Sequence, residues 1–201
     1  MGISTIGLVV AAVAGYLLGS ANSSLIVGKF YGVDVRHHGS GNAGMTNTLR
    51  TLGKKAAVLV SAGDILKGVL AYLVGQLLAG PYGILAAGTA AIIGHNWPVY
   101  FGFKGGKGAL TSITVLFYMD WKIALITLGV FVALVAVSRY VSLGSIVGAV
   151  VFPVLAGAFG RNTVFILFSV FIGLLVIFRH RSNISRILNG TESRLGAKKQ
   201  A

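Results

Sequence analysis

The chain has 201 residues, of which 55% are apolar and only 10% are charged, and its mean hydropathy is +0.85. A typical soluble domain is about 45–50% apolar and about 25% charged. The composition therefore excludes an ordinary soluble protein and predicts an integral membrane protein. The formal net charge is +13, because 17 Lys and Arg stand against 4 Asp and Glu.

Seven apolar runs are candidates for membrane spans. A lipid-exposed backbone must satisfy its own hydrogen bonds, and the runs lack the strict alternation of a β-barrel strand, so each is predicted to be an α-helix. The fourth run is shorter than the roughly 20 residues that cross a hydrocarbon core, which implies local bilayer thinning or a submerged polar flank. The predicted fold is an all-α integral membrane protein, a single domain over 1–201, with seven transmembrane helices at 3–27, 56–79, 82–97, 109–121, 123–137, 143–159 and 163–178.

The first long connection, 31–55, contains the segment GSGNAGMTNTLR. Its glycines let backbone N–H groups turn toward a ligand, and such nests bind anions. A helix beginning near Thr46 would place its N-terminus at that ligand, and Arg50 offers a planar fork for phosphate. The alternative is a flexible connector with a helix cap, because Gly, Ser and Asn also dominate ordinary turns. The candidate site residues are Ser40, Asn42, Thr46, Asn47 and Arg50.

Two charged residues stand inside the second run. Asp64 and Lys67 are three positions apart, so on a helix they share a face and can pair, which lowers the cost of each charge in lipid. A position lining a cavity and a plain packing role both agree with this spacing.

The second long connection, 94–108, reads GHNWPVYFGFKGGKG. Its end directly precedes the fourth run, so glycine amides and two ammonium groups converge at a predicted helix start, where an anion is favoured. The segment is not a Walker A loop, because no Ser or Thr follows Lys107. An interfacial anchor of basic and aromatic residues is an equally good interpretation. The candidate substrate-binding residues are Gly102, Lys104, Gly105, Gly106, Lys107 and Gly108.

A third polar patch, RHRSNISRILNGTE, lies in the tail 179–201. His180 and Asn183 are three positions apart and would share a helix face. His180 is a candidate base or a donor to an oxyanion, and the alternative is a plain interfacial histidine. Glu192 has several arginines within reach, which favours a structural ion pair. Ser142 adds a hydroxyl group on the same predicted side of the membrane and is a further candidate substrate-binding residue.

The basic residues outside the spans are distributed unevenly. If consecutive loops alternate sides, only Lys122 and Arg161 fall on one side, and all the others fall on the opposite side. The positive-inside rule then places the N-terminus outside and both long loops and the C-terminus in the cytoplasm. The same charges also attract anionic lipids. Long loops are usually kept for binding, so the site is predicted at the cytoplasmic face.

The scarcity of acids limits the chemistry. A Mg²⁺ site needs oxygen ligands, chiefly carboxylates, and the chain has only Asp34, Asp64, Asp120 and Glu192. We therefore expect no metal and no other cofactor, with the cations themselves neutralising the substrate. This favours simple phosphate esters over nucleoside triphosphates, and a site between helices suits a reactant with an acyl tail.

The segments GSGNAGMTNTLRTLG, GHNWPVYFGFKGGKG and RHRSNISRILNGTE, in that order, resemble the three signature regions of the bacterial acyl-phosphate:glycerol-3-phosphate acyltransferases, the PlsY family. SANSSLIVGK and GDILKG also look like this family's first and second spans, although Ala21-Asn22 replaces a more apolar pair. The likeness runs over about 19–192. It implies transfer of a fatty acyl group from acyl phosphate to the 1-hydroxyl of glycerol 3-phosphate, giving lysophosphatidic acid and inorganic phosphate.

The resemblance also implies roles for single residues. Ser40, His180 and Asn183 would be catalytic, the loop 102–108 would bind the acyl phosphate, and Glu192 would maintain the structure. We further assign Arg50 and Lys104 as phosphate clamps, with Ser40 and Asn183 as orienting donors. The base is His180 or a phosphate oxygen of the substrate.

The implied setting is the first step of phospholipid synthesis at the bacterial cytoplasmic membrane. The expected partners are glycerol 3-phosphate, a fatty acyl phosphate and membrane lipid, with functional coupling to the enzyme that makes acyl phosphate, and with no nucleic acid. The alternative function is a transporter or flippase for a phosphorylated metabolite or lipid. That alternative predicts broken helices near the membrane centre and polar residues leading to both faces, whereas the outward half of this chain is poor in polar side chains.

Overall fold

The computed structural model describes residues 4–196, and within this range all regular secondary structure is helical. Residue 3, at the start of the first expected span, and the tail residues 197–201 lie outside the described residues. The chain divides into two compact units, Met1–Met119 and Asp120–Ala201. The expectation of a single domain stays a prediction, and each unit is described separately below.

Residues 4–119 of the first unit form five α-helices and two short 3-10 helices. They are α1 (Thr5–Ser20), α2 (Ser23–Phe30), η1 (Val35–His37), α3 (Met45–Leu52), α4 (Lys54–Asn96), η2 (Val99–Phe101) and α5 (Ala109–Met119). The break between α1 and α2 falls at Ala21-Asn22, the pair that departs from the family pattern. The side chain of Asn22 accepts a hydrogen bond from the Leu25 amide at 3.1 Å, so this residue caps α2.

Helix α4 doubles back on itself at Gly80. Ala79 and Gly80 have non-helical backbone angles, and the φ of +58° at Gly80 favours glycine. Pro81 follows, at the start of the second arm, where its missing N–H costs little. A Cβ atom at Gly75 would collide with the backbone of Gly83, although eight residues of straight helix would separate them by about 12 Å. The two arms therefore correspond to the expected runs 56–79 and 82–97.

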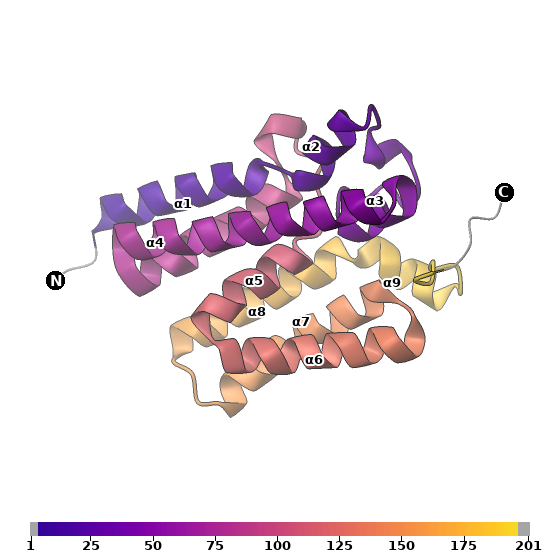
Figure 1. Cartoon of the computed structure of the whole chain (residues 1–201). Coiled ribbons are helices and arrows are strands. Elements are labelled where there is room, and N and C mark those ends of the chain that lie inside the picture. Colours follow the sequence, from indigo (N-terminus) through magenta and orange to yellow (C-terminus); the bar gives the residue numbers. More distant parts are fainter. Residues whose placement is uncertain (1–3, 197–201) are drawn as a thin grey trace. The chain divides into compact units, whose positions relative to one another are not determined.

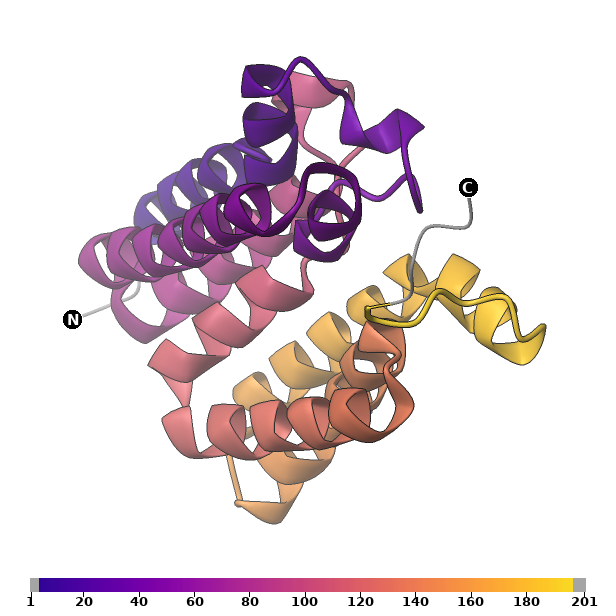
Figure 2. The same cartoon turned by 45° about the vertical axis from the view of Figure 1, so that its right-hand side comes forward.

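Small residues let α1 pack closely on the second arm of α4. A Cβ atom at Gly15 would collide with the backbone of Ala87, and one at Gly19 would collide with the backbone of Ala91. Close backbone approach through small residues is the usual way in which helices associate in membranes. Figures 1 and 2 show α1 beside α4 in both views.

In the described part of the second unit, consecutive helices pack against one another. Its helices are α6 (Trp121–Ser138), α7 (Val141–Ala158), α8 (Thr163–Arg179) and α9 (Arg181–Leu188), and α7 packs against both α6 and α8. The Asp120 carboxylate caps α6 by accepting from the Ile123 amide at 3.2 Å, and it also accepts from Arg161 Nε at 2.6 Å. This ion pair ties the start of α6 to the turn between α7 and α8.

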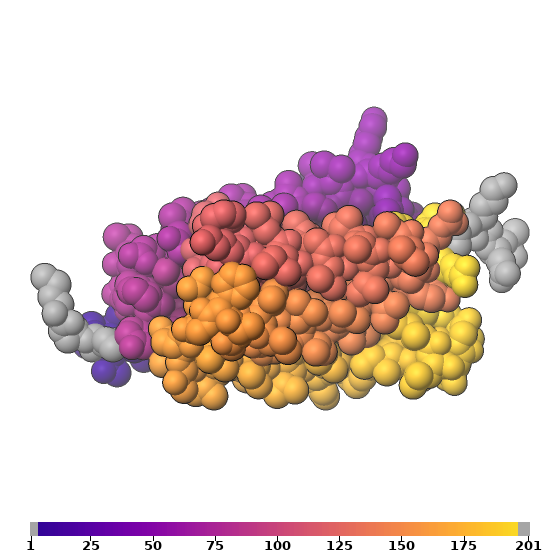
Figure 3. Space-filling view, turned by 90° about the horizontal axis from the view of Figure 1, so that it is seen from below, coloured from indigo at the N-terminus to yellow at the C-terminus, as the bar shows by residue number. Residues whose placement is uncertain are grey.

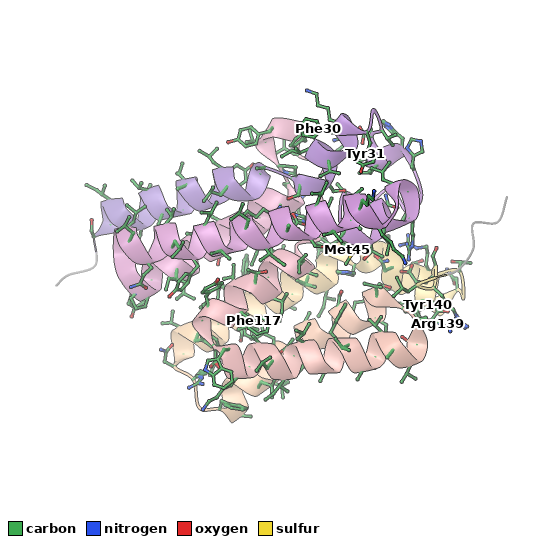
Figure 4. The ribbon with its side chains drawn as sticks, in the orientation of Figure 1. Phe30, Tyr31, Met45, Phe117, Arg139 and Tyr140 are labelled. Carbon is green, nitrogen blue, oxygen red and sulfur yellow. The ribbon has the colours of Figure 1, made fainter. Side chains whose placement is uncertain are left out.

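The outer surfaces of the helices are apolar. Side chains coloured salmon to orange, which include those of α6 and α8, form a continuous surface in Figure 3. Exposed apolar residues on these two helices include Val132, Val137, Leu167, Phe171 and Leu174. Figure 4 labels Phe30 at the end of α2, and this side chain is 86% exposed. Apolar exposure on this scale fits contact with lipid rather than water.

Length and hydropathy identify four stretches that can cross a membrane: Thr5–Phe30, Lys54–Phe101, Trp121–Ser138 and Val141–Ala158. A fifth is added if α8 and α9, which are bent by 57° at their junction, are counted as one span. Helix α5 has 11 residues and is shorter than these. The prediction of an all-helical membrane protein is confirmed. Seven spans and an outside N-terminus stay predictions.

Candidate functional site

The predicted site residues fall into two groups, one in each unit. Both long loops, 31–55 and 94–108, belong to the first unit. Ser142 and the tail residues His180 and Asn183 belong to the second unit.

Asn47 organises the first loop from within. It lies in the first turn of α3, as the predicted helix start near Thr46 requires, and is only 1% exposed. Its Oδ1 atom accepts from the Ser40 amide at 2.8 Å, and its Nδ2 donates to the carbonyls of Val35 at 2.8 Å and His38 at 3.0 Å. The Asn47 side chain therefore holds the loop in place. A role in contacting substrate stays a prediction for this residue.

The remaining candidates of this loop take distinct positions. The Ser40 side chain is exposed, Asn42 and Thr46 are half-buried, and Arg50 lies half-buried near the end of α3. Helix α3 is anchored beneath them by Thr48, whose hydroxyl is 2.7 Å from that of Ser24 in α2. Ser40 is thus presented at the surface by a buried hydrogen-bonded support.

Arg36, which the sequence reasoning missed, connects the two loops. Its Nη1 donates to the carbonyls of Phe101 at 3.0 Å and Lys104 at 3.4 Å, and its Nε and Nη2 bind the Asp34 carboxylate, with Nη2 at 2.7 Å from Oδ2. The hydrogen bond from Arg36 lowers the pKa of Asp34 from 3.8 to about 2. The sequence could have suggested the pair of Asp34 and Arg36, because the acid stands two residues before the arginine. Nothing in the sequence showed that Arg36 also donates to carbonyl groups of the second loop.

The glycines of the second loop allow it to fold back on the end of α4. The Gly105 amide donates to the Asn96 carbonyl at 3.3 Å, and the Gly106 amide donates to the His95 carbonyl at 3.0 Å. A Cβ atom at Gly106 would collide with the His95 ring and lie 2.5 Å from the Ala43 carbonyl of the first loop. Close packing therefore requires glycine here. The substrate contacts expected of Gly105 and Gly106 stay predictions.

Two glycines near the ends of the second loop have a left-handed backbone conformation. Gly102 has a φ of +63° and Gly108 a φ of +75°, both of which favour glycine. Lys104 is exposed and Lys107 is half-buried between them. The loop thus presents a basic side chain at its tip and leads directly into α5.

Three side chains with buried polar atoms lie in the first turn of α5 or next to the loop that leads into it. Asn96 is fully buried, and neither atom of its amide group has a hydrogen-bond partner among the described residues. The hydroxyl groups of Thr111 and Ser112 share this condition. A Cβ atom at Gly108 would lie 2.9 Å from Asn96 Oδ1, so this amide group is directly beside the loop. Buried polar groups are normally paired, so these unpaired groups set this part of the interior, next to the loop, apart.

The expected pair in α4 is present. Lys67 Nζ lies 2.7 Å from Asp64 Oδ1, and both side chains are buried. Their position lining a cavity stays a prediction.

His180 stands at the bend between α8 and α9 and is 4% exposed. Its Nδ1 lies 2.8 Å from the Val176 carbonyl oxygen. A carbonyl can only accept, so Nδ1 carries the proton, and in the neutral ring Nε2 is the basic nitrogen. This tautomer is the one that a general base acting through Nε2 requires.

Glu192 is the centre of a buried network in the second unit. Its Oε1 accepts from Ser142 Oγ at 2.6 Å and Asn183 Nδ2 at 2.7 Å, and its Oε2 accepts from Arg186 Nε at 2.7 Å. Burial alone would raise the pKa of this carboxyl group, but the three hydrogen bonds outweigh it and hold the pKa below its usual range. These contacts give Glu192 a structural role, because its carboxylate holds the Asn183 side chain in one orientation. The Ser142 hydroxyl donates to the same carboxylate, and its expected contact with substrate stays a prediction.

The segment after α9 returns to the turn between α6 and α7, where Figure 4 labels Arg139 and Tyr140. The Leu195 amide donates to the Arg139 carbonyl at 2.7 Å, and the Arg194 guanidinium lies 5.5 Å from the centre of the Tyr140 ring. These contacts close the tail around Glu192.

Known proteins resemble this chain over nearly its full length. Residues 9–190 match the family model described as glycerol-3-phosphate acyltransferase. The chain is 48% identical over 191 residues to a glycerol-3-phosphate acyltransferase of Thermoanaerobacter sp. (strain X514), with 94% of this chain and 96% of that protein covered. It is 46% identical over 199 residues to the same-named protein of Clostridioides difficile (strain 630), with 96% and 97% covered.

Solved structures agree. The glycerol 3-phosphate form of PlsY, an integral membrane glycerol 3-phosphate acyltransferase, matches with a TM-score of 0.88 and 39% identity, covering 94% of this chain and 96% of that one. The lysophosphatidic acid form of PlsY matches with a TM-score of 0.84 and 38% identity, covering 94% and 95%. The earlier resemblance is confirmed by these matches, and the chain belongs to the glycerol-3-phosphate acyltransferase family of integral membrane proteins.

Proposed function

We propose that this protein transfers a fatty acyl group from acyl phosphate to the 1-hydroxyl of glycerol 3-phosphate. The products are lysophosphatidic acid and inorganic phosphate. The observation that carries the proposal is the family match over 9–190, which includes the first two polar segments and residues 179–190 of the third. The related PlsY structures, described as glycerol 3-phosphate and lysophosphatidic acid forms, are named for the acceptor and the product of this reaction.

The chemistry needs little from the protein besides position and charge. The hydroxyl oxygen of glycerol 3-phosphate attacks the acyl carbon of the mixed anhydride and forms the ester bond. The bond from that carbon to the phosphate oxygen breaks, and phosphate leaves with the electron pair. The hydroxyl proton passes to His180 Nε2 or to a phosphate oxygen, and general base catalysis of this kind contributes about 10²–10⁴-fold. Positioning of the two reactants and stabilisation of the oxyanion supply the remainder.

We assign a role to each residue from the chemistry of its side chain and from its place in the loops. Arg50 and Lys104 clamp phosphate groups, and Ser40 orients a reactant from the surface of the first loop. Asn42, Thr46 and the loop 102–108 complete the substrate contacts. Asn183 acts as a donor oriented by Glu192, while Asn47 and Ser142 contribute by holding their neighbours in place.

The proposal includes catalysis without a divalent metal. Each of the four carboxylates in the chain is already paired with a cation, namely Asp34 with Arg36, Asp64 with Lys67, Asp120 with Arg161, and Glu192 with Arg186. A carboxylate-held Mg²⁺ would have to break such a pair. Fixed cations would therefore neutralise the phosphates.

The proposal also includes a location. With seven spans and the N-terminus outside, both long loops and the tail face the cytoplasm in the bacterial cytoplasmic membrane. The reversal of α4 at Gly80 supports two spans within that helix. Acyl phosphate must be made by another enzyme, so functional coupling to that enzyme is part of the proposal.

The deciding experiment measures phosphate release from palmitoyl phosphate by the purified protein, with and without glycerol 3-phosphate. We expect release that depends on the acceptor, formation of lysophosphatidic acid, and unchanged turnover after thorough chelation. Movement of glycerol 3-phosphate into proteoliposomes without ester formation would support the transporter instead. Turnover that stops on chelation and returns with Mg²⁺ would overturn the metal-free mechanism.

A further inference from the structure

A buried polar cluster lies between the two arms of α4. Asp64 and Lys67 belong to the first arm and His95 to the second, and the three residues are 2%, 4% and 3% exposed. Lys67 Nζ lies 2.7 Å from Asp64 Oδ1 and 2.6 Å from His95 Nδ1. The side chain of Ser23, in α2, is hydrogen-bonded to Asp64. The cluster thus joins three helical segments of the first unit.

The chemistry of the cluster fixes the state of the His95 ring. The Lys67 ammonium has only donors, so His95 Nδ1 must accept from it. The neutral ring then carries its proton on Nε2. A buried ammonium is costly unless it is paired and hydrogen-bonded, and Asp64 and His95 meet both needs. The ammonium group of Lys67 is therefore bound by Asp64 and His95 inside the protein, and we do not assign it a contact with a substrate.

The other edge of the His95 ring faces the place where the two loops meet. A Cβ atom at Gly106 would collide with His95 Nε2 and lie close to the Ala43 carbonyl oxygen, so all three groups are in contact around the Gly106 Cα atom. The backbone of His95 holds the same loop, because its carbonyl accepts from the Gly106 amide at 3.0 Å. Ala43 in turn is held by Asn22, whose Nδ2 donates to the Ala43 carbonyl at 3.4 Å.

We propose that Asp64, Lys67 and His95 form a positioning unit that seats the second loop against the first. The lysine and the carboxylate fix the ring, and the ring fixes the spacing of Gly106 from Ala43. None of the three is assigned a contact with substrate. The proposal rests on the proposed function, since the loop spacing matters because both loops bind the phosphates of the reactants.

Two substitutions of His95 distinguish the role of the ring edge that faces Lys67 from the role of the edge that faces Gly106. In His95→Asn the shorter amide keeps an acceptor near Lys67 but withdraws the edge that faces Gly106. In His95→Gln the longer amide places a donor near the former Nε2. If the unit positions the loops, His95→Asn raises the KM for palmitoyl phosphate, for glycerol 3-phosphate, or for both, by roughly tenfold with kcat changed by less than threefold. His95→Gln restores at least part of that loss.

The double variant Asp64→Asn with Lys67→Met removes the charges together and avoids an unpaired buried ion. We expect the same rise in KM, because the ring is no longer fixed. The matched control is Asp120→Asn with Arg161→Gln, which removes a carboxylate pair of the second unit whose Asp120 side chain is 7% exposed. The control should lower the thermal unfolding temperature and leave both KM values unchanged.

A spectroscopic measurement tests the unit independently of turnover. ¹⁵N-histidine NMR of the full-length protein, with the His95 signal assigned by its loss in His95→Asn, should show the Nε2-protonated tautomer. The population of that tautomer relative to the Nδ1-protonated one should fall in the double variant, because no ammonium group donates to Nδ1 there. An Nδ1-protonated His95 in the wild type would overturn the inference even if acyl transfer is observed. Equal KM values in all variants would also overturn it, whereas a wild type without acyl transfer but with the expected tautomer would overturn only the proposed function.

Discussion

At the scale of single residues, the distribution of charge carries most of the functional argument. Every acid has a basic partner within ion-pair distance, and the formal net charge of the chain is +13. The acids are therefore used for structure, and cations in excess of them remain. Exposed charges at the surface interact weakly when isolated, but a doubly charged phosphate meeting several fixed cations gains charge-assisted hydrogen bonds.

The Asp34–Arg36 pair gives a prediction about pH. The pKa of Asp34 is lowered from 3.8 to about 2 in the folded protein, so the pair stabilises the fold fully above pH 3.8 and loses that contribution as the pH falls toward about 2. We expect Asp34→Asn to lower the unfolding temperature by the same amount at every pH between about 5 and 8. Thermal unfolding in detergent measures this difference.

The control is the wild-type protein measured over the same pH range. The difference between the two proteins should shrink only below pH 3.8. A difference that already shrinks near neutral pH would show that another group is responsible.

Glu192 gives a prediction about orientation. Replacing it by Gln turns one acceptor oxygen into a donor facing Ser142 and Asn183 or facing Arg186, so at least one buried hydrogen bond is lost. Such a loss costs about 1–3 kcal/mol of the free energy of unfolding. Because Asn183 loses its fixed orientation, we expect kcat to fall as well, measured as acceptor-dependent phosphate release.

The matched comparison is Arg186→Gln, which removes a donor to Glu192 Oε2 and leaves the hydrogen bonds that Oε1 accepts from Ser142 and Asn183. This variant should be destabilised with a smaller loss of kcat. If Arg186→Gln lowers kcat as much as Glu192→Gln does, Asn183 orientation is not the cause.

At the scale of elements, apolar patterning predicted the helices well. The runs 56–79 and 82–97 correspond to the two arms of α4, and the helix expected near Thr46 begins at Met45. Patterning could not predict the direction of individual groups. The Gly105 and Gly106 amides point back to α4, and Asn47 points inward, because each is bonded to a carbonyl that only the folded chain brings close.

Contacts between residues far apart in the chain could not be predicted either, because only folding brings the partners together. The pair Asp64 and Lys67 was predictable from its spacing on one helix. Its third member, His95, lies 28 residues after Lys67 and enters the cluster only because α4 reverses at Gly80. The link from Arg36 to the second loop spans a longer gap, 65 residues to Phe101 and 68 to Lys104, and gave no local signal.

The glycines between α1 and α4 give a prediction about packing. A Cβ atom at Gly19 would collide with the Ala91 backbone, so Gly19→Ala forces the helices apart. Overpacking of this kind costs about 1–3 kcal/mol. The matched control is Gly129→Ala in α6, where nothing lies within 4 Å of the added Cβ atom and helix propensity favours alanine by about 0.5–1 kcal/mol.

Thermal unfolding in detergent should therefore move in opposite directions for the two variants. Equal effects would show that the close approach of α1 to α4 does not limit stability.

At the scale of the whole molecule, the number of spans decides where the loops face. By length and hydropathy, Lys54–Phe101 is one candidate span of 48 residues, whereas the reversal at Gly80 divides it into two. With seven spans and an outside N-terminus, the loops 31–55 and 94–108 share the cytoplasm. If α4 crossed only once, the two loops would face opposite compartments, and no site could contain both.

Single cysteines test this, because the chain has no Cys of its own. His37→Cys and Tyr100→Cys report the two long loops, and Tyr82→Cys and Lys122→Cys report the opposite turns. All four positions are exposed. Because each span reverses the side of the chain, an impermeant thiol reagent added to intact cells should label only the last two, and the first two should react only after the membrane is opened. Each variant must retain acceptor-dependent phosphate release. Labelling of Tyr100→Cys from outside while His37→Cys stays protected would place the loops on opposite sides and would rule out a shared phosphate site.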